Sequence, residues 1–598
     1  MNKIITCASP HGQPVPAEAG TATLDVLVFG AFGYGTTDVR AAFLAADAAA
    51  DGRAIFVPEG RYFIGSDLAM SHVLQCAGHL VMPDEADLSL SKTFDLDGYA
   101  SALGSQVMGL KKGLKHLLNQ HEFTSFDMCG RYIVLDEPFD LQAIAATKNS
   151  FTRRRVLRNG TLAAATSSAW ADNVVLREAS WAEEAGDQLN DVSNAAAIPV
   201  GSLVNARAGV GREIYVRAVN AAQNRIFLNK PLSAAEARQT YTFTAFQYMI
   251  DLQGWQNLQH FELEDVTFAC GGQASALRLP LRGLDLRIEG CVFDAPKDRA
   301  VTSTDEGCQG LQIENCRFSS NEQSQTVPDR SSIGFNINAA EARICNNSAD
   351  MFLHFGVIHG TGAIISGNRI CQGDTVTEGM RSPGLVISKA DARIMICSNR
   401  VEHCYIEWTN EHDASPEYER GRSFHGMTVQ GNTFIATSAA RWMRFISVKP
   451  MGTGHFIDGL SVTGNVFKKT RGATLFAVEG VDTSIADLDL SRVASIVFAQ
   501  NTYHGIEKKT ENPAGIRASQ AKAQTTWLVD FSDHTPFGAP VKYGVSILPD
   551  GPVRSITQAP VYTQPWTQGG HGSGGRSLRI GWSQAVSGSA QVTARCDT

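Results

Sequence analysis

Large apolar residues recur at a nearly constant spacing through the middle of the chain. Phe268, Phe293 and Phe318 are separated by 25 residues each, and Ile370 follows Phe318 after 52. The series continues at steps of 31, 33, 33 and 36 residues with Val401, Phe434, Phe467 and Tyr503. A fixed period with insertions predicts stacked structural units whose loops lengthen on one side.

Polar residues mark the turns between these units. In the later units an Asn precedes the apolar residue by two positions, as in Asn432-Thr433-Phe434, and Asn346-Asn347-Ser348 is a weak copy. An Asn at a repeated turn tolerates a left-handed backbone and can bond to the next coil. Because 25 residues fit three short strands and three turns, the unit is predicted to be one coil of a parallel β-helix. An antiparallel sandwich or barrel with coincidental spacing is the alternative.

Composition excludes some classes of protein. The chain has 598 residues, of which 43% are hydrophobic and 19% charged, a globular balance. A net charge of −8 argues against nucleic acid as a partner, and it suits neutral glycans better than polyanions. Twelve scattered cysteines are interpreted as small interior fillers, with disulfides or a metal cluster as the alternatives. We expect no cofactor.

Neither end of the chain nor its interior predicts membrane insertion. The first residues lack the apolar run of a secretory signal, and no segment is apolar enough to span a membrane. We therefore expect synthesis in the cytoplasm without a signal peptide.

A strand, a Gly-rich turn and a helix open the ordered part of the chain. Residues 25–35 read as the strand and turn, and apolar spacing predicts a helix over 39–51 that Gly52 ends. No Gly-Lys-Ser/Thr and no Gly-x-Gly-x-x-Gly occurs there, which argues against a nucleotide site. A second helix is predicted over 107–119.

Residues 29–68 resemble the opening module of the pectate-lyase-like superfamily, which includes polygalacturonase-related proteins and many phage tailspikes. Together with the repeat, the resemblance spans about 25–505. It implies an all-β fold, namely a right-handed single-stranded parallel β-helix with an N-terminal capping helix and a C-terminal β module. The tailspike branch further implies a homotrimer.

The expected domain organisation follows from these patterns. It comprises a tail that could dock on other virion proteins (1–24), the N-terminal cap and first coils (25–100), an irregular region with a small inserted β module (101–250), the main β-helix (251–508), and a linker with a C-terminal β module (509–598).

The superfamily's hydrolytic motif is missing from the repeat. The polygalacturonase set of Asn-x-Asp, Asp-Asp, Gly-His-Gly and Arg-x-Lys is absent, and Gly-His-Gly occurs only at 570–572, outside the repeat. Polygalacturonase activity is therefore not expected.

The stretched unit at 401–413 holds the strongest candidate chemistry. Counting from the repeated apolar residue places His354, Glu407 and Arg444 on one face of neighbouring strands. That ladder suits a glycan-binding groove, and it also suits an ordinary solvated face. The full set of candidates comprises the catalytic acids Glu407, Glu411, Asp413 and Asp374 and the binding residues His354, Arg381, Tyr405, Trp442 and Arg444, with no metal ligands.

These features favour a phage-type tailspike or receptor-binding spike, carried on the virion tail, that recognises a bacterial surface polysaccharide. Depolymerisation is left open, with hydrolysis favoured over elimination because the candidates are carboxylates. The alternatives are a free extracellular polysaccharide lyase or hydrolase and a non-catalytic structural or adhesive β-helix.

Overall fold

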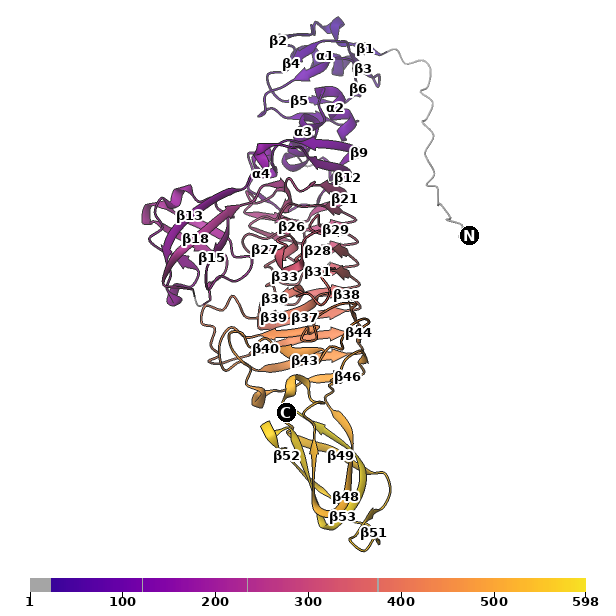
Figure 1. Cartoon of the computed structure of the whole chain (residues 1–598). Helices are drawn as coiled ribbons and strands as arrows, with labels where there is room; N and C mark the ends of the chain where they lie inside the picture. The colour runs from indigo at the N-terminus through magenta and orange to yellow at the C-terminus, as the bar shows by residue number, and fades with distance from the viewer. Residues whose placement is uncertain (1–22, 121, 234, 374–375) are drawn as a thin grey trace. The chain divides into compact units, whose positions relative to one another are not determined.

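The computed structural model describes residues 23–120, 122–233, 235–373 and 376–598 (Figure 1). They belong to two compact units, Met1–Cys129 and Gly130–Thr598. Almost all of the expected docking tail, 1–24, lies outside the described residues. Within them, no helix combines the length and the apolar character needed to cross a membrane.

The first unit pairs short parallel strands with three helices. Helix α1 (Arg40–Ala49) buries Phe43 and Ala46, and it confirms the helix predicted after the Gly-rich turn. Helix α3 (Gln106–Asn119) confirms the second predicted helix and is capped by Ser105, whose hydroxyl accepts from the Met108 N–H. The other elements that lie wholly in this unit are α2 (Leu96–Leu103), β1 (Leu24–Asp25), β2 (Tyr34–Asp38), β3 (Ile55–Val57), β4 (Arg61–Phe63), β5 (Leu68–Met70), β6 (Leu74–Cys76), β7 (His79–Val81), β8 (Leu88–Leu90) and the short 3-10 helix η1 (Val26–Phe29). The strand predicted at the start of residues 25–35 is wrong beyond Asp25, because η1 follows there, with the Asp25 side chain accepting from the Leu27 N–H.

A ten-stranded parallel sheet runs along the second unit, with one strand from each successive coil. Its strands, in spatial order, are β10 (Phe139–Asp140), β19 (Tyr248–Asp251), β22 (Ser275–Arg278), β26 (Arg299–Thr302), β30 (Ile333–Ile337), β33 (His354–Ile358), β36 (Pro383–Ile387), β39 (Tyr405–Thr409), β42 (Ile446–Lys449) and β45 (Glu479–Val481). Because neighbours in space are also successive in the chain with parallel register, this is a parallel β-helix, and the predicted fold class is confirmed.

Two further ladders of parallel strands complete most coils. The first contains β24 (Arg287–Glu289), β28 (Gln312–Glu314), β31 (Arg343–Cys345), β34 (Ile364–Ser366), β37 (Asp391–Cys397), β40 (Phe424–Gln430), β43 (Ile457–Thr463) and β46 (Val497–Ala499). The second contains β25 (Val292–Asp294), β29 (Arg317–Ser319), β32 (Ser348–Asp350), β35 (Arg369–Cys371), β38 (Arg400–Glu402), β41 (Thr433–Ala436), β44 (Val466–Lys469) and β47 (Thr502–His504). Both ladders continue from β21 (Phe261–Ala269).

The repeated apolar residues form a buried column in the second ladder. Phe268, Phe293 and Phe318 are in register, and their rings stack with centroids 5.1 Å and 4.7 Å apart. In the unit with the weak copy of the pattern, Asn346-Asn347-Ser348, the residue that belongs to this column is Ala349, which is in register with Phe318 and Ile370. The sequence pattern had placed Ser348 there, one residue too early.

A column of side-chain amides lies beside the apolar column. From Asn368 onward, each Oδ1 accepts bonds from the backbone N–H and the Nδ2 of the asparagine one coil earlier, at 2.9–3.0 Å in the case of Asn399, Asn432 and Asn465. Each Nδ2 donates to a carbonyl, as Asn432 does to Ile396 at 2.9 Å. The column consists of Asn347, Asn368, Asn399, Asn432, Asn465 and Asn501.

Earlier coils fill the same column with cysteine. Cys316 donates its backbone N–H to the Oδ1 of Asn347 at 2.8 Å, and its thiol lies 3.5 Å from the Ile288 carbonyl, so the thiol replaces the donation from the amide to a carbonyl. The cysteines in the described part of the chain are free, and the interior position expected of them is found for Cys270, Cys291, Cys308, Cys316, Cys404 and Cys596, which are buried, whereas the others are partly exposed. The left-handed residue of each turn is the one before the asparagine, with φ between 58° and 68°, which corrects the expectation for the asparagine itself.

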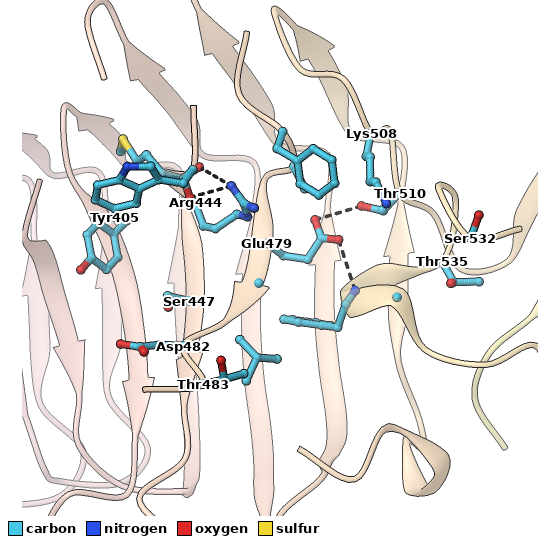
Figure 2. A pocket seen from close by; sticks show the side chains of 18 of the residues that line it. Tyr405, Arg444, Ser447, Glu479, Asp482, Thr483, Lys508, Thr510, Ser532 and Thr535 are labelled. Carbon is cyan, nitrogen blue, oxygen red and sulfur yellow. Dashed lines mark hydrogen bonds between the residues drawn. The ribbon is translucent and has the colours of Figure 1, made fainter. Parts of the chain in front are cut away.

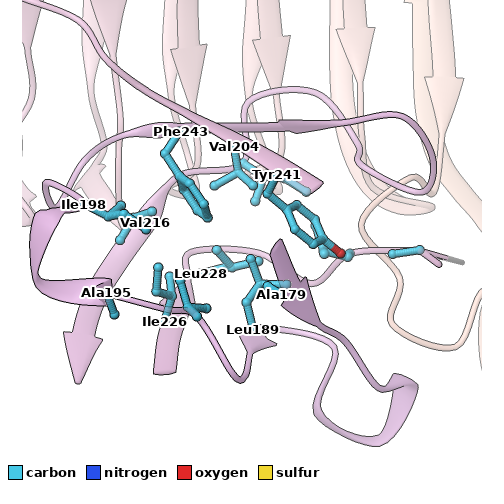
Figure 3. Packing of buried hydrophobic residues seen from close by; sticks show 14 residues of the cluster. Ala179, Leu189, Ala195, Ile198, Val204, Val216, Ile226, Leu228, Tyr241 and Phe243 are labelled. Atoms are coloured by element: carbon cyan, nitrogen blue, oxygen red, sulfur yellow. The ribbon is translucent and has the colours of Figure 1, made fainter. Parts of the chain in front are cut away.

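An inserted antiparallel module precedes the main β-helix. One sheet contains β13 (Asn173–Ser180), β18 (Arg238–Ala245) and β15 (Leu203–Ala206), and the other contains β14 (Gln188–Leu189), β17 (Arg225–Leu228) and β16 (Val216–Asn220). The two sheets share one apolar core, with Val204 and Phe243 from the first and Ile226 and Leu228 from the second (Figure 3).

The chain ends in an antiparallel β module with its own core. The long strands β48 (Ala514–Asp530) and β53 (Ser577–Arg595) pair with each other. Around β53 lie β49 (Tyr543–Pro549), β50 (Val553–Arg554) and β52 (Trp566–His571), and β51 (Pro560–Val561) pairs with β50. Trp527, Trp582 and Ile580 contribute to the core.

The amide column gives a test of the fold. The substitution Asn432→Ala removes the acceptor of two Asn399 donors and the donor to Ile396. We expect it to lower the free energy of unfolding by about 3 kcal/mol, because buried groups left without partners keep their full desolvation cost. Denaturant titration measures this, with the exposed Asn173→Ala as the control. Equal midpoints for the two variants would contradict a stabilising column.

Candidate functional site

A pocket of about 620 Å³ lies where the last strands of the ten-stranded sheet meet residues of the C-terminal module (Figure 2). Tyr405 of β39, Ser447 of β42 and Glu479 of β45 line it from successive coils. The turn containing Phe537 and the segment ending at Thr510 line the opposite side. The site is therefore built at the final coil, where no further coil covers β45.

Three of the residues selected from the sequence line this pocket together. They are Tyr405, Trp442 and Arg444. Trp442 is 58% exposed, so most of its ring is free for a ligand. Arg444 lies against Gly480, where an added Cβ would lie 3.1 Å from its Cγ and Nε. Exposed aromatic rings beside hydrogen-bonding groups are a common arrangement in sugar-binding sites, because each sugar has an apolar face and polar edges.

Glu479 places a carboxyl group at a position that earlier coils fill with an apolar side chain. It is in register with Ile446, and it is 4% exposed. Its Oε2 accepts from the Thr510 hydroxyl at 3.0 Å and its Oε1 from the Phe537 N–H at 3.2 Å. Burial raises the pKa of Glu479 although both hydrogen bonds lower it. Burial is therefore the larger of the two opposing effects on this carboxyl group.

Asp482 supplies a second carboxyl group with the opposite tendency. It lines the same pocket, accepts from the Ser484 N–H at 3.0 Å and lies 3.5 Å from the Lys449 Nζ. Burial raises its pKa, but the bonds from Ser484 and the charge of Lys449 outweigh burial and lower it. The pocket thus holds one carboxyl group with a raised pKa, that of Glu479, and one with a lowered pKa, that of Asp482.

The sequence reasoning missed Glu479, Asp482 and Lys508, which also line the pocket. One signal was available for Glu479. It interrupts an apolar run, Phe476-Ala477-Val478 before it and Val481 after it, at an inward position of a coil. Lys508 comes from a segment outside the repeated strands, so no periodicity could place it.

Glu407 and Glu411 lie elsewhere, against the inserted module. Arg212 of that module donates to the Oε1 of Glu407, and its Nε lies 3.1 Å and 3.0 Å from the two oxygens of Glu411. Burial alone lowers the pKa of Arg212, but the two carboxylates overcome it and raise the pKa. The structure gives both glutamates a role in holding the module, and their catalytic role stays a prediction.

A reciprocal ion pair lies next to Arg212 in the chain. Glu213 of the module accepts from Arg299 of β26 at 2.7 Å and 3.1 Å, and from the Tyr215 hydroxyl at 2.5 Å. All three side chains are buried. The module therefore contributes a cation, Arg212, to acids of the β-helix, and an anion, the adjacent Glu213, to Arg299 of the β-helix.

The remaining predicted site residues are separated from the pocket. His354 is buried, its Nδ1 lies 2.6 Å from the Pro383 carbonyl, and burial lowers its pKa to about 3. Arg381 is also buried and donates to the Ser438 carbonyl at 2.7 Å. Asp413 accepts from the Asn410 amide at 3.0 Å, and burial raises its pKa. Asp374 lies outside the described residues.

The predicted alignment of His354, Glu407 and Arg444 is wrong. Glu407 is in register with Val386 before it and Ser447 after it, whereas His354 is in register with Ile333. A bulge in β36 between Pro383 and Leu385 shifts the register, and a constant count from the repeat cannot detect it.

Metal ligation finds no support in the described part of the chain. No group of three or more His, Cys, Asp and Glu side chains there could hold a metal ion.

Comparison with solved structures returns, among others, phage tailspikes and a surface adhesin. A tailspike of E. coli bacteriophage HK620, as a double mutant, matches with 11% identity over 96% of this chain and 94% of that chain, at a TM-score of 0.36. The gp54 tailspike of Acinetobacter baumannii bacteriophage AP22, in complex with capsular saccharide, matches with 8% identity over 96% of both chains, at a TM-score of 0.29. PfbA, a surface adhesin of Streptococcus pneumoniae, matches with 12% identity over 81% of this chain and 91% of that chain, at a TM-score of 0.28.

The chain is similar in fold to phage tailspikes. No family model matches the chain, and no curated protein matches it in sequence. Because the TM-scores are below 0.5, the β-helix assignment rests on the strand register of this chain.

The ion pairs of the inserted module lead to a prediction. Arg212→Ala leaves Glu407 and Glu411 buried without their shared partner, which costs about 3–5 kcal/mol in comparable buried pairs. We expect amide hydrogens of β39 to exchange roughly a hundredfold faster or more, measured by hydrogen–deuterium exchange. Arg238→Ala, which breaks an exposed pair with Glu178, should leave exchange unchanged. Unchanged exchange in both variants would contradict the attachment through Arg212.

Proposed function

We propose that this chain is a spike protein that binds a bacterial surface polysaccharide in the pocket lined by Tyr405, Trp442 and Arg444. The observation that carries the proposal is the exposed Trp442 ring beside Tyr405 and hydrogen-bonding side chains in a pocket of about 620 Å³. That volume fits a few sugar residues. The tailspike-like opening module supports a place on a virion, and the N-terminal tail would then dock on other tail proteins.

Binding can be tested directly at the aromatic ring. Trp442→Ala should weaken binding of purified capsular polysaccharide about tenfold, because it removes the largest apolar surface offered to the sugar. Isothermal titration calorimetry measures the affinity. Tyr132→Ala is the matched control, since Tyr132 is an aromatic residue that is 61% exposed and does not line this pocket. If neither variant loses affinity, the pocket is not the binding site.

Hydrolysis is a second candidate function, favoured by the two carboxyl groups of opposite tendency. Glu479 would protonate the leaving oxygen, and Asp482 would act as the ionised partner. Retaining and inverting glycosidases differ in the distance between their two carboxyl groups and in the anomeric form of the product. The anomeric form of the product would therefore report the mechanism.

The hydrolytic proposal has its own test. Glu479→Gln should lower the release of reducing ends from the polysaccharide by at least about a hundredfold while binding is retained. In the wild type, activity should fall as pH rises through the raised pKa of Glu479 and as pH falls through the lowered pKa of Asp482. Binding without any release of reducing ends would leave a spike that holds its sugar intact.

Self-association as a homotrimer belongs to the same proposal. The C-terminal module exposes several large apolar side chains, namely Leu528, Tyr543, Val545, Leu548, Ile556, Tyr562 and Trp566. Several exposed apolar side chains within one module are a feature that proteins often bury in an interface. Sedimentation equilibrium should give three times the mass of one chain, and Leu548→Lys should lower that mass. A monomeric wild type would overturn this part of the proposal.

A further inference from the structure

One aromatic ring at the edge of the pocket gathers three cations. The Arg444 guanidinium lies 5.3 Å, the Lys508 Nζ 4.7 Å and the Arg441 guanidinium 5.4 Å from the centroid of Phe476. Attraction to the ring accounts for part of this arrangement. Positive charges so close together nevertheless repel one another unless anions compensate them.

Two of the three cations have an anion of their own. Arg441 pairs with Glu507, and Lys508 lies 2.6 Å from Asp533. Arg444 differs, because none of the described carboxylates lies within ion-pair distance of it. Its Nη1 instead donates to the carbonyls of Trp442 at 2.6 Å and Met443 at 3.1 Å.

The contacts of Arg444 fix its position without neutralising it. The backbone carbonyls hold one edge of the guanidinium, and Gly480 lets the side chain lie flat against β45. Burial lowers the pKa of Arg444, Glu479 raises it and Arg441 lowers it. Glu479 lies beyond ion-pair distance of Arg444, and its two oxygens accept hydrogen bonds from Thr510 and Phe537 instead.

We propose that the polysaccharide bound in this pocket is acidic, and that Arg444, with Lys508 beside it, binds the carboxylate of a uronic acid or a similar carboxylated sugar. This inference rests on the proposed function and names its substrate class. A guanidinium matches a carboxylate because its N–H groups form a planar fork that meets both oxygens.

The local charge of the pocket contrasts with that of the chain. Arg444, Lys508 and Arg576 line it, whereas the chain as a whole carries a net charge of −8. Of the two acids in the lining, Asp482 has Lys449 as its partner. The net negative charge of the chain would therefore weaken binding of an acidic polymer in general, and a pocket with a local excess of cations would favour binding at this place.

The experiment compares two forms of one polysaccharide. The probes are a purified uronic acid-containing capsular polysaccharide and the same preparation after its carboxyl groups have been reduced to alcohols. We expect the wild type to bind the native form at least tenfold more tightly, with affinity that falls as salt rises. Arg444→Met should lose this difference, and Arg444→Lys should keep part of it.

The controls separate failure of this inference from failure of the proposed function. Arg471→Met removes an exposed arginine that does not line the pocket and should change nothing. Thermal unfolding of each variant checks that it folds. Equal binding of both forms by the wild type would overturn the acidic ligand and leave the polysaccharide site standing. Binding of neither form of any such polysaccharide would overturn the proposed function.

Discussion

The column of buried amides from Asn347 to Asn501 holds successive coils in one register. From Asn368 onward each side chain accepts two hydrogen bonds from the coil before it and donates one to a carbonyl, so the buried members of the column have partners for their polar atoms. The aromatic column depends on the same register, because rings stack only if the strands that carry them stay aligned. The pocket depends on it too, since Tyr405, Ser447 and Glu479 come from three different coils.

Attachment of the inserted module follows a different rule. Its own core is apolar, yet its contacts with the β-helix include the buried pairs of Arg212 and Glu213. Lys230 is buried nearby, and burial lowers its pKa to about 8. Buried charges are costly unless they are paired with good geometry, so such an interface tolerates few alternative positions of the module. The buried ion pairs therefore fix the position of the inserted module on the β-helix.

Much of the fold could be predicted from the sequence, because the period of Phe268, Phe293 and Phe318 reflects stacking directly. The outward positions of Tyr405 and Trp442 were also found by counting. The partners of Glu407 could not be found, since Arg212 lies 195 residues away in an insertion that has no repeat. The register of His354 was missed because Ala349 carries no apolar signal and a bulge in β36 adds a residue. Periodicity thus locates the strands but not the loops and insertions that meet them.

The position of Glu479 at the last coil has a consequence for how binding specificity can change. In a solenoid each coil contacts mainly its neighbours, so a substitution near β45 disturbs few of the coils before it. Residues 476–484 and the C-terminal segments opposite them can therefore vary with little effect on the rest of the β-helix. Substitutions there would reshape one side of the pocket, while Tyr405, Trp442 and Arg444 from the preceding part of the chain would keep the other side unchanged.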